Sequence, residues 1–136
     1  MSGRGEHVLG LRDGRYFAIV LFCHGDKDRD WLASVWRDGE GPWHIDYRFR
    51  YYATCDKGDA FSGKDEKSEY SATARPGMTE TEVCTSVRLM GEMLVRTGFN
   101  DKIDVVETKS DDPAKVFELL QGRPWFHVKP VSEAGV

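Results

Sequence analysis

The longest strictly alternating segment of the chain runs from Trp43 to Cys55. Successive side chains of a β-strand point to opposite faces of the sheet, so this period of two predicts a strand with a core side and a polar side. The set that we expect in the core is Trp43, Ile45, Tyr47, Phe49, Tyr51, Ala53 and Cys55. The opposite set is His44, Asp46, Arg48, Arg50, Tyr52 and Thr54. A strand of this length needs partners, and the chain before it supplies them.

Two turn signals divide the N-terminal part into further strands. Asp13-Gly14 joins two apolar runs, and Asp-Gly tolerates the positive φ of a type I′ hairpin turn. The segment 38–42 then leads back into the long strand. We therefore predict an antiparallel meander of about four strands, Glu6–Arg12, Arg15–Cys23, Trp31–Arg37 and Trp43–Cys55. If Arg37 pairs with Trp43, the register sets Val35 opposite Ile45, Trp36 opposite His44 and Leu32 opposite Arg48.

The C-terminal half reads as helices around a short strand. Residues 56–77 have no period and are expected to form a long, mobile loop. Thr79–Glu82 fits a capping box, and Val83, Val87, Met90 and Leu94 continue with helical spacing up to Gly98. A strand at Lys102–Thr108, a helix from Asp112-Pro113 to Gly122 and a terminal edge strand at Pro124–Lys129 complete the prediction. The expected fold is one α+β domain spanning residues 1–136.

The composition limits the cellular locations and the classes of partner that we expect. The chain has 136 residues and a net charge of −4, the wrong sign for a protein that coats nucleic acid or anionic lipid. It contains no apolar run that could span a bilayer, and its start lacks the apolar stretch of a secretory signal. Cys23, Cys55 and Cys84 are an odd number without a CxxC pair, which favours reduced thiols. We expect a cytoplasmic protein with no membrane segment and no bulk nucleic-acid binding.

The candidate ligand site lies on the polar side of the long strand. Guanidinium groups pair with phosphate or carboxylate, and aromatic rings stack on planar ligands. The expected ligand-binding residues are Trp36, His44, Arg48, Arg50 and Tyr52, with Arg75 contributed by the loop 56–77. The competing interpretation is a solvated sheet face in which Asp46 pairs with a neighbouring arginine.

Histidine and cysteine chemistry provides weaker candidates. His24-Gly25-Asp26 and His44-Ile45-Asp46 each place an imidazole and a carboxylate two residues apart, but a meander puts them at opposite ends of their strands, so no shared metal site is expected. Cys84 falls in the first turn of a helix, where the helix dipole can lower a thiol pKa. No nucleotide-binding or catalytic motif accompanies these residues, and structural cysteines are the simpler interpretation.

These observations rank three functions. The first is a small intracellular binding protein for an anionic, nucleotide-like ligand, with no cofactor. The alternative is a protein-interaction or inhibitor module whose exposed aromatic residues contact a macromolecular partner. The second alternative is a small enzyme with His24 or His44 as the acid-base group, which ranks last because no catalytic motif is present. Association of the chain with a second copy, through the sheet edge or face, is compatible with each function.

Overall fold

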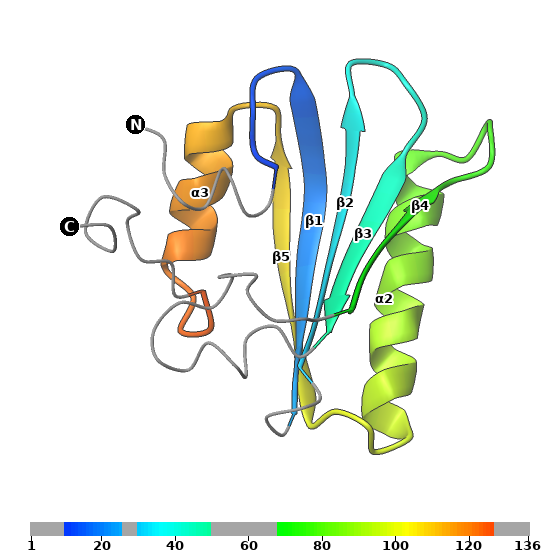
Figure 1. The fold of residues 1–136 in the computed structure, drawn as a ribbon, viewed down its shortest axis with the longest axis vertical. Helices are drawn as coiled ribbons and strands as arrows, with labels where there is room; N and C mark the ends of the chain where they lie inside the picture. Colours follow the sequence, from blue (N-terminus) through cyan, green and yellow to red (C-terminus); the bar gives the residue numbers. More distant parts are fainter. Residues whose placement is uncertain (1–9, 26–29, 50–67, 127–136) are drawn as a thin grey trace.

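The structure is a computed structural model that describes residues 10–25, 30–49 and 68–126. Its elements are, in chain order, β1 (Arg15–His24), β2 (Trp31–Asp38), β3 (His44–Phe49), β4 (Ser68–Thr73), α2 (Glu80–Arg96), β5 (Lys102–Ser110) and α3 (Pro113–Gln121). The strands form one antiparallel five-stranded sheet in the order β4-β3-β2-β1-β5 (Figure 1). The predicted α+β class, with a meander followed by helix, strand and helix, is confirmed. No helix in the described part of the chain is both long and apolar enough to cross a membrane.

The register predicted between the second and third strands of the meander is also confirmed. Val35 lies opposite Ile45, Trp36 opposite His44, and Leu32 opposite Arg48. Partners across the two strands share one face of the sheet. A slip of one residue would move every apolar side chain to the other face, so the alternation determines the register. Residues 50–55 of the predicted long strand lie outside the described residues.

The N-terminal hairpin prediction is wrong. Gly14 does adopt a positive φ of 87°, and the Arg15 N–H donates to the Arg12 carbonyl across a turn. However, β1 pairs with β2 along one edge and with β5 along the other. A strand has only two edges, so β1 has none left for a preceding strand, and residues 10–12 are not extended in a ladder. The rest of that predicted strand, residues 6–9, lies outside the described residues.

The fourth strand of the meander comes from a segment that the sequence assigned to a loop. Ser68–Thr73, at the end of the predicted loop 56–77, forms β4 and pairs with β3 from Phe49↔Ser68 to His44↔Thr73. Its composition is small and polar, so its own sequence carries little strand signal. The open edge of β3 supplies the backbone partners that make it a strand. Residues 56–67 lie outside the described residues.

Helix α2 begins as its sequence predicts. The Thr79 side chain accepts a hydrogen bond from the Glu82 N–H, and the Glu82 carboxylate accepts one from the Thr79 N–H, which completes the capping box. The buried positions are Val83, Cys84, Val87 and Gly91. Met90, which the spacing placed on the buried side, is 43% exposed, and Gly91 takes the position nearest the sheet instead.

Helix α3 and the segment after it cover the other face of the sheet. Asp112 caps the first turn by accepting from the Ala114 N–H, and Pro113 occupies the first helical position, as predicted. The predicted terminal strand is not formed in its described part, residues 124–126, where Trp125 and Phe126 instead pack into the core. The Trp125 ring stacks on Phe22 at 4.7 Å between centroids, and its Nε1–H donates to Asp104.

The sheet therefore separates two apolar cores, with α2 and α3 at opposite sides in Figure 1. The core beneath α2 contains Ile19, Leu21, Cys23, Trp31, Ala33, Val35, Trp43, Val83 and Val87. The core beneath α3 contains Phe17, Val20, Phe22, Leu32, Trp36, Val106, Val116 and Leu120. Because both faces are covered, β1 and the first part of β2 are apolar without alternation.

Candidate functional site

The structure places Trp36 and His44 in contact on the α3 side of the sheet. Their rings stack at 4.4 Å between centroids with 25° between planes. The guanidinium carbon of Arg15, on the other neighbouring strand, lies 3.4 Å from the Trp36 ring centroid. Since β2 lies between β1 and β3, the indole is enclosed from both sides, and Trp36 is only 9% exposed. A planar ligand would have to displace one of these groups before it could stack on Trp36.

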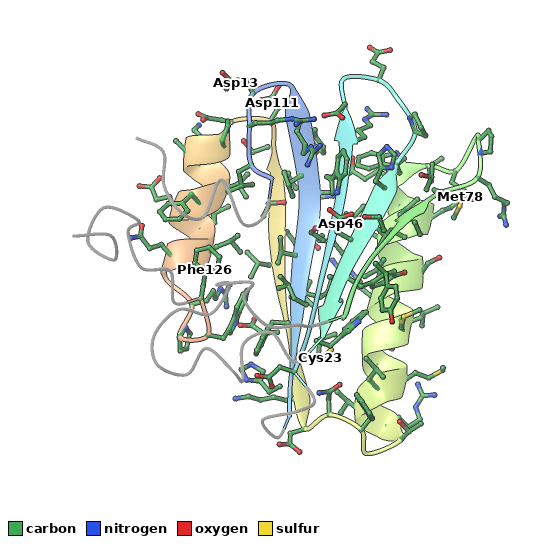
Figure 2. The ribbon with its side chains drawn as sticks, viewed as in Figure 1. Asp13, Cys23, Asp46, Met78, Asp111 and Phe126 are labelled. Carbon is green, nitrogen blue, oxygen red and sulfur yellow. The ribbon has the colours of Figure 1, made fainter. Side chains whose placement is uncertain are left out.

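On this face of the sheet, Asp46 accepts hydrogen bonds from both neighbouring strands. One carboxylate oxygen accepts from Trp36 Nε1 at 2.9 Å, and the other accepts from Ser71 Oγ at 2.7 Å. His44 contacts Thr73 through Nδ1 and Oγ1, which lie 3.2 Å apart. Asp46, which belongs to β3, is labelled in Figure 2. The carboxylate predicted to pair with an arginine or to serve His44 is thus occupied by an indole and a hydroxyl, so the pair His44–Asp46 does not form an acid-base dyad.

The structure describes the other predicted residues only in part. Arg48 belongs to β3, where its backbone lies opposite Leu32 on one side and Glu69 on the other. Arg50 and Tyr52 lie outside the described residues, so their roles stay predictions. Arg75 follows β4 and lies at a pocket with Trp43, a residue of the α2-side core. The structure therefore separates Arg75 from Trp36 and His44.

That pocket has a volume of about 460 Å³ and lies near the N-terminal end of α2. It is lined by Arg37, by residues 40–43 of the β2–β3 turn and by residues 75–78 of the β4–α2 connection. The two walls are held together because the Ala74 N–H donates to the Trp43 carbonyl at 2.8 Å, just beyond the β3–β4 ladder. Its volume falls in the range of small-molecule sites, roughly 300–1,000 Å³.

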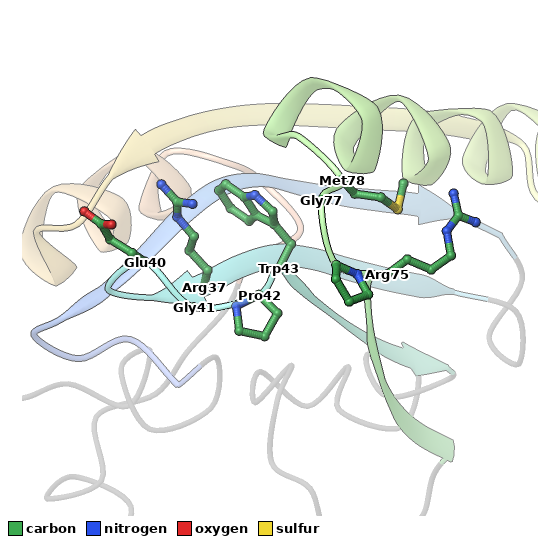
Figure 3. A pocket seen from close by; sticks show the side chains of 9 residues that line it. Arg37, Glu40, Gly41, Pro42, Trp43, Arg75, Gly77 and Met78 are labelled. Atoms are coloured by element: carbon green, nitrogen blue, oxygen red, sulfur yellow. The ribbon is translucent and has the colours of Figure 1, made fainter.

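Arg37 is the residue of this pocket whose bonding is incomplete. Its guanidinium carbon lies 4.6 Å from the Trp43 ring centroid, a cation–π contact. Its Nε atom is buried and has no hydrogen-bond partner. Among the described residues, no carboxylate forms a salt bridge with Arg37 or Arg75. Figure 3 shows Trp43 between Arg37 and Met78, with the Arg75 side chain on the far side and directed outwards.

Sequence reasoning assigned Trp43 to the core and did not select Arg37. Trp43 is indeed buried, but it also lines the pocket. The signal that could have found the pair was the turn itself, because the predicted register places Arg37 opposite Trp43. Side chains directly opposite each other across antiparallel strands lie close enough for an arginine to cover an indole.

The histidine and cysteine candidates are constrained by burial. Burial and the charge of Lys102 lower the pKa of His24, which packs edge-on against Phe22. Burial raises the pKa of Cys23 to about 12 and that of Cys84 to about 11. For Cys84, burial is the largest cause of this shift, and it favours the protonated thiol at neutral pH. Asp26 and Cys55 lie outside the described residues.

Among the residues that the structure describes, no group of three or more histidine, cysteine or carboxylate side chains could hold a metal ion. Comparisons of the chain with protein-family models, with curated proteins and with solved structures find no match.

Proposed function

We propose that the protein binds a small anionic ligand with a planar ring, such as a nucleoside monophosphate, in the pocket between Arg37 and Arg75. The observation that carries the proposal is the buried, unpaired Nε of Arg37. A buried charged donor without an acceptor costs more free energy than a paired one, and an anionic ligand would supply the acceptor. Guanidinium groups suit this role because they donate to phosphate or carboxylate in a bidentate manner.

The other pocket residues fit such a ligand. Pro42 and Met78 provide apolar contact for a ring beside the buried Trp43, and Arg75 provides a second positive charge that is exposed and unpaired among the described residues. Glu40 is the one carboxylate among the described lining residues, so these residues carry a net positive charge although the chain as a whole is acidic. Compared with the sequence-based proposal, the ligand class is retained and the site moves from Trp36 to Trp43.

Thermal unfolding in the presence of AMP, GMP, CMP, UMP, the matching nucleosides and inorganic phosphate tests the proposal. A ligand at ten times its dissociation constant stabilises the folded state by about 1.4 kcal/mol. For a domain of this size that raises Tm by about 4–6 °C. We expect a phosphorylated probe to raise Tm and its nucleoside to have a smaller effect, because only the former carries the negative charge that Arg37 would bind.

A pair of matched variants tests whether the ligand binds in this pocket. Arg37→Gln should abolish the Tm increase, whereas Arg123→Gln, which removes the same charge beside Asp104 on the other side of the sheet, should leave it intact. If every probe fails to change Tm, or if Arg37→Gln retains the full increase, the proposal is refuted.

One observation favours the alternative of a protein-interaction module. Leu89 and Met93 on α2 are exposed although they are large and apolar. Native mass spectrometry of the purified protein separates the two functions, because a retained small molecule and a retained protein chain give different mass increments.

A further inference from the structure

The solvent side of α2 carries a stripe of residues at alternating spacings of four and three. Its members, Glu82, Ser86, Leu89, Met93 and Arg96, are all exposed. Leu89 is 55% exposed and Met93 is 51% exposed. The side of the helix that packs on the sheet is a different one, formed by Val83, Val87 and Gly91.

This spacing is that of the seam of a coiled coil. Positions that repeat every 3.5 residues stay on one side of a helix and can face a second helix along their whole length. At about 1.5 Å per residue, the stripe extends for roughly 21 Å, nearly the full length of α2. Its apolar members occupy the middle and its charged members the two ends.

The order of the side chains makes the stripe complementary to itself when it is reversed. About a two-fold axis at Leu89, an antiparallel copy sets Glu82 against Arg96 and Leu89 against Leu89, with Ser86 and Met93 within one residue of the same level. Both ends then pair opposite charges. A parallel copy would instead set Glu82 against Glu82 and Arg96 against Arg96, so charge selects the antiparallel arrangement.

The charged ends are available for this pairing. Glu82 uses Oε1 in the capping box, which holds its side chain at the helix terminus, and its second oxygen remains. Arg96 forms no ion pair or side-chain hydrogen bond with any residue in the described ranges. A positive side chain at the end of a helix and a negative one at its start also suit the helix dipoles of both copies.

We propose that this stripe is a self-association surface, through which two copies of the chain pair their α2 helices antiparallel. A contact of one helix face per copy is smaller than the roughly 1,600 Å² of a standard stable interface, so the dimer is reversible and depends on concentration. This inference does not depend on the proposed ligand, because the pocket is lined by residues that precede α2.

Sedimentation velocity of the full chain over a wide range of protein concentration tests the proposal at low ionic strength. We expect a monomer–dimer equilibrium that shifts toward monomer in high salt, because the two end pairs are exposed. Leu89→Ser should weaken association about tenfold or more, since two leucines leave the seam. Leu119→Ser on α3 is the matched control, because Leu119 is 47% exposed and lies outside the stripe.

Charge variants test the antiparallel register. Arg96→Glu alone and Glu82→Arg alone should each weaken self-association, because like charges then meet at both ends. An equimolar mixture of the two variants should form heterodimers at the wild-type level. A wild-type chain that stays monomeric throughout would overturn the proposal, and so would a dimer that Leu89→Ser and Arg96→Glu both leave unchanged. Circular dichroism of each variant verifies that α2 is still formed.

Discussion

Replacing Gly91 by alanine measures how closely α2 approaches the sheet. A Cβ atom at this position would lie 2.4 Å from Cδ1 of Ile103, whereas carbon atoms ordinarily meet at about 3.5–4.0 Å. Alanine in a helix interior is favoured over glycine by about 1 kcal/mol, but such an overlap costs about 1–3 kcal/mol. Taking a cost near 2 kcal/mol, we expect Gly91→Ala to lower the free energy of unfolding by about 1 kcal/mol.

A substitution in β5, outside the helix, can remove this steric overlap. Ile103→Val deletes the Cδ1 methyl group and alone should cost about 1 kcal/mol. In that background the Cβ atom meets only ordinary contacts, to Cys23 and Leu21 at 3.4 Å, so the same Gly91→Ala change should stabilise by up to about 1 kcal/mol. The effect of the alanine thus changes sign, and the coupling energy between the two sites is about 2 kcal/mol.

Urea unfolding of the four proteins of this cycle, with a common m-value, measures the coupling. Additive effects, within about 0.5 kcal/mol, would refute the close approach of α2 to β5. A stabilising Gly91→Ala in the wild-type background would refute it as well, because helix propensity alone would then account for the result.

Two further predictions concern the interior. Asp46→Ala should lower the free energy of unfolding, measured with urea, by about 1–2 kcal/mol, because Trp36 Nε1 loses its acceptor in a part-buried site. In a Trp36→Phe background the same change should cost less. An equal cost in both backgrounds would count against the hydrogen bond. The pKa of Cys23 is raised from 9.0 to about 12, so above pH 9 the unfolded chain ionises first and stability should decline as pH rises toward 12. The urea midpoint across this range should decline less in Cys23→Ala, and equal declines would contradict the burial effect.

Much of the fold could be predicted because its signals are local. The alternation from His44 to Phe49, the capping box at Thr79 and the Asp112-Pro113 start of α3 each determine their element through neighbouring residues. The β2–β3 register followed from turn length and alternation, since a shift of one residue would turn every apolar side chain outward.

The candidate site was less predictable because its members meet only through the fold. Trp36 and His44 lie together on one face of the sheet, as the register predicts. Arg15 and Asp46 contact Trp36 from the two neighbouring strands, and the sequence of one strand does not reveal such contacts. The pocket brings Arg37 together with Arg75, which is separated from it by two strands along the chain.

The sequence alone determined that Trp43 is an apolar residue of a sheet and that the adjoining residues alternate between a core side and a polar side. The tertiary structure decided which strands border that sheet, because β5 takes the edge of β1 expected for the N-terminal segment and β4 forms on the open edge of β3. The physical reason is that pairing at an edge depends on which backbone reaches it, and strands this distant along the chain leave no local signal of their partner.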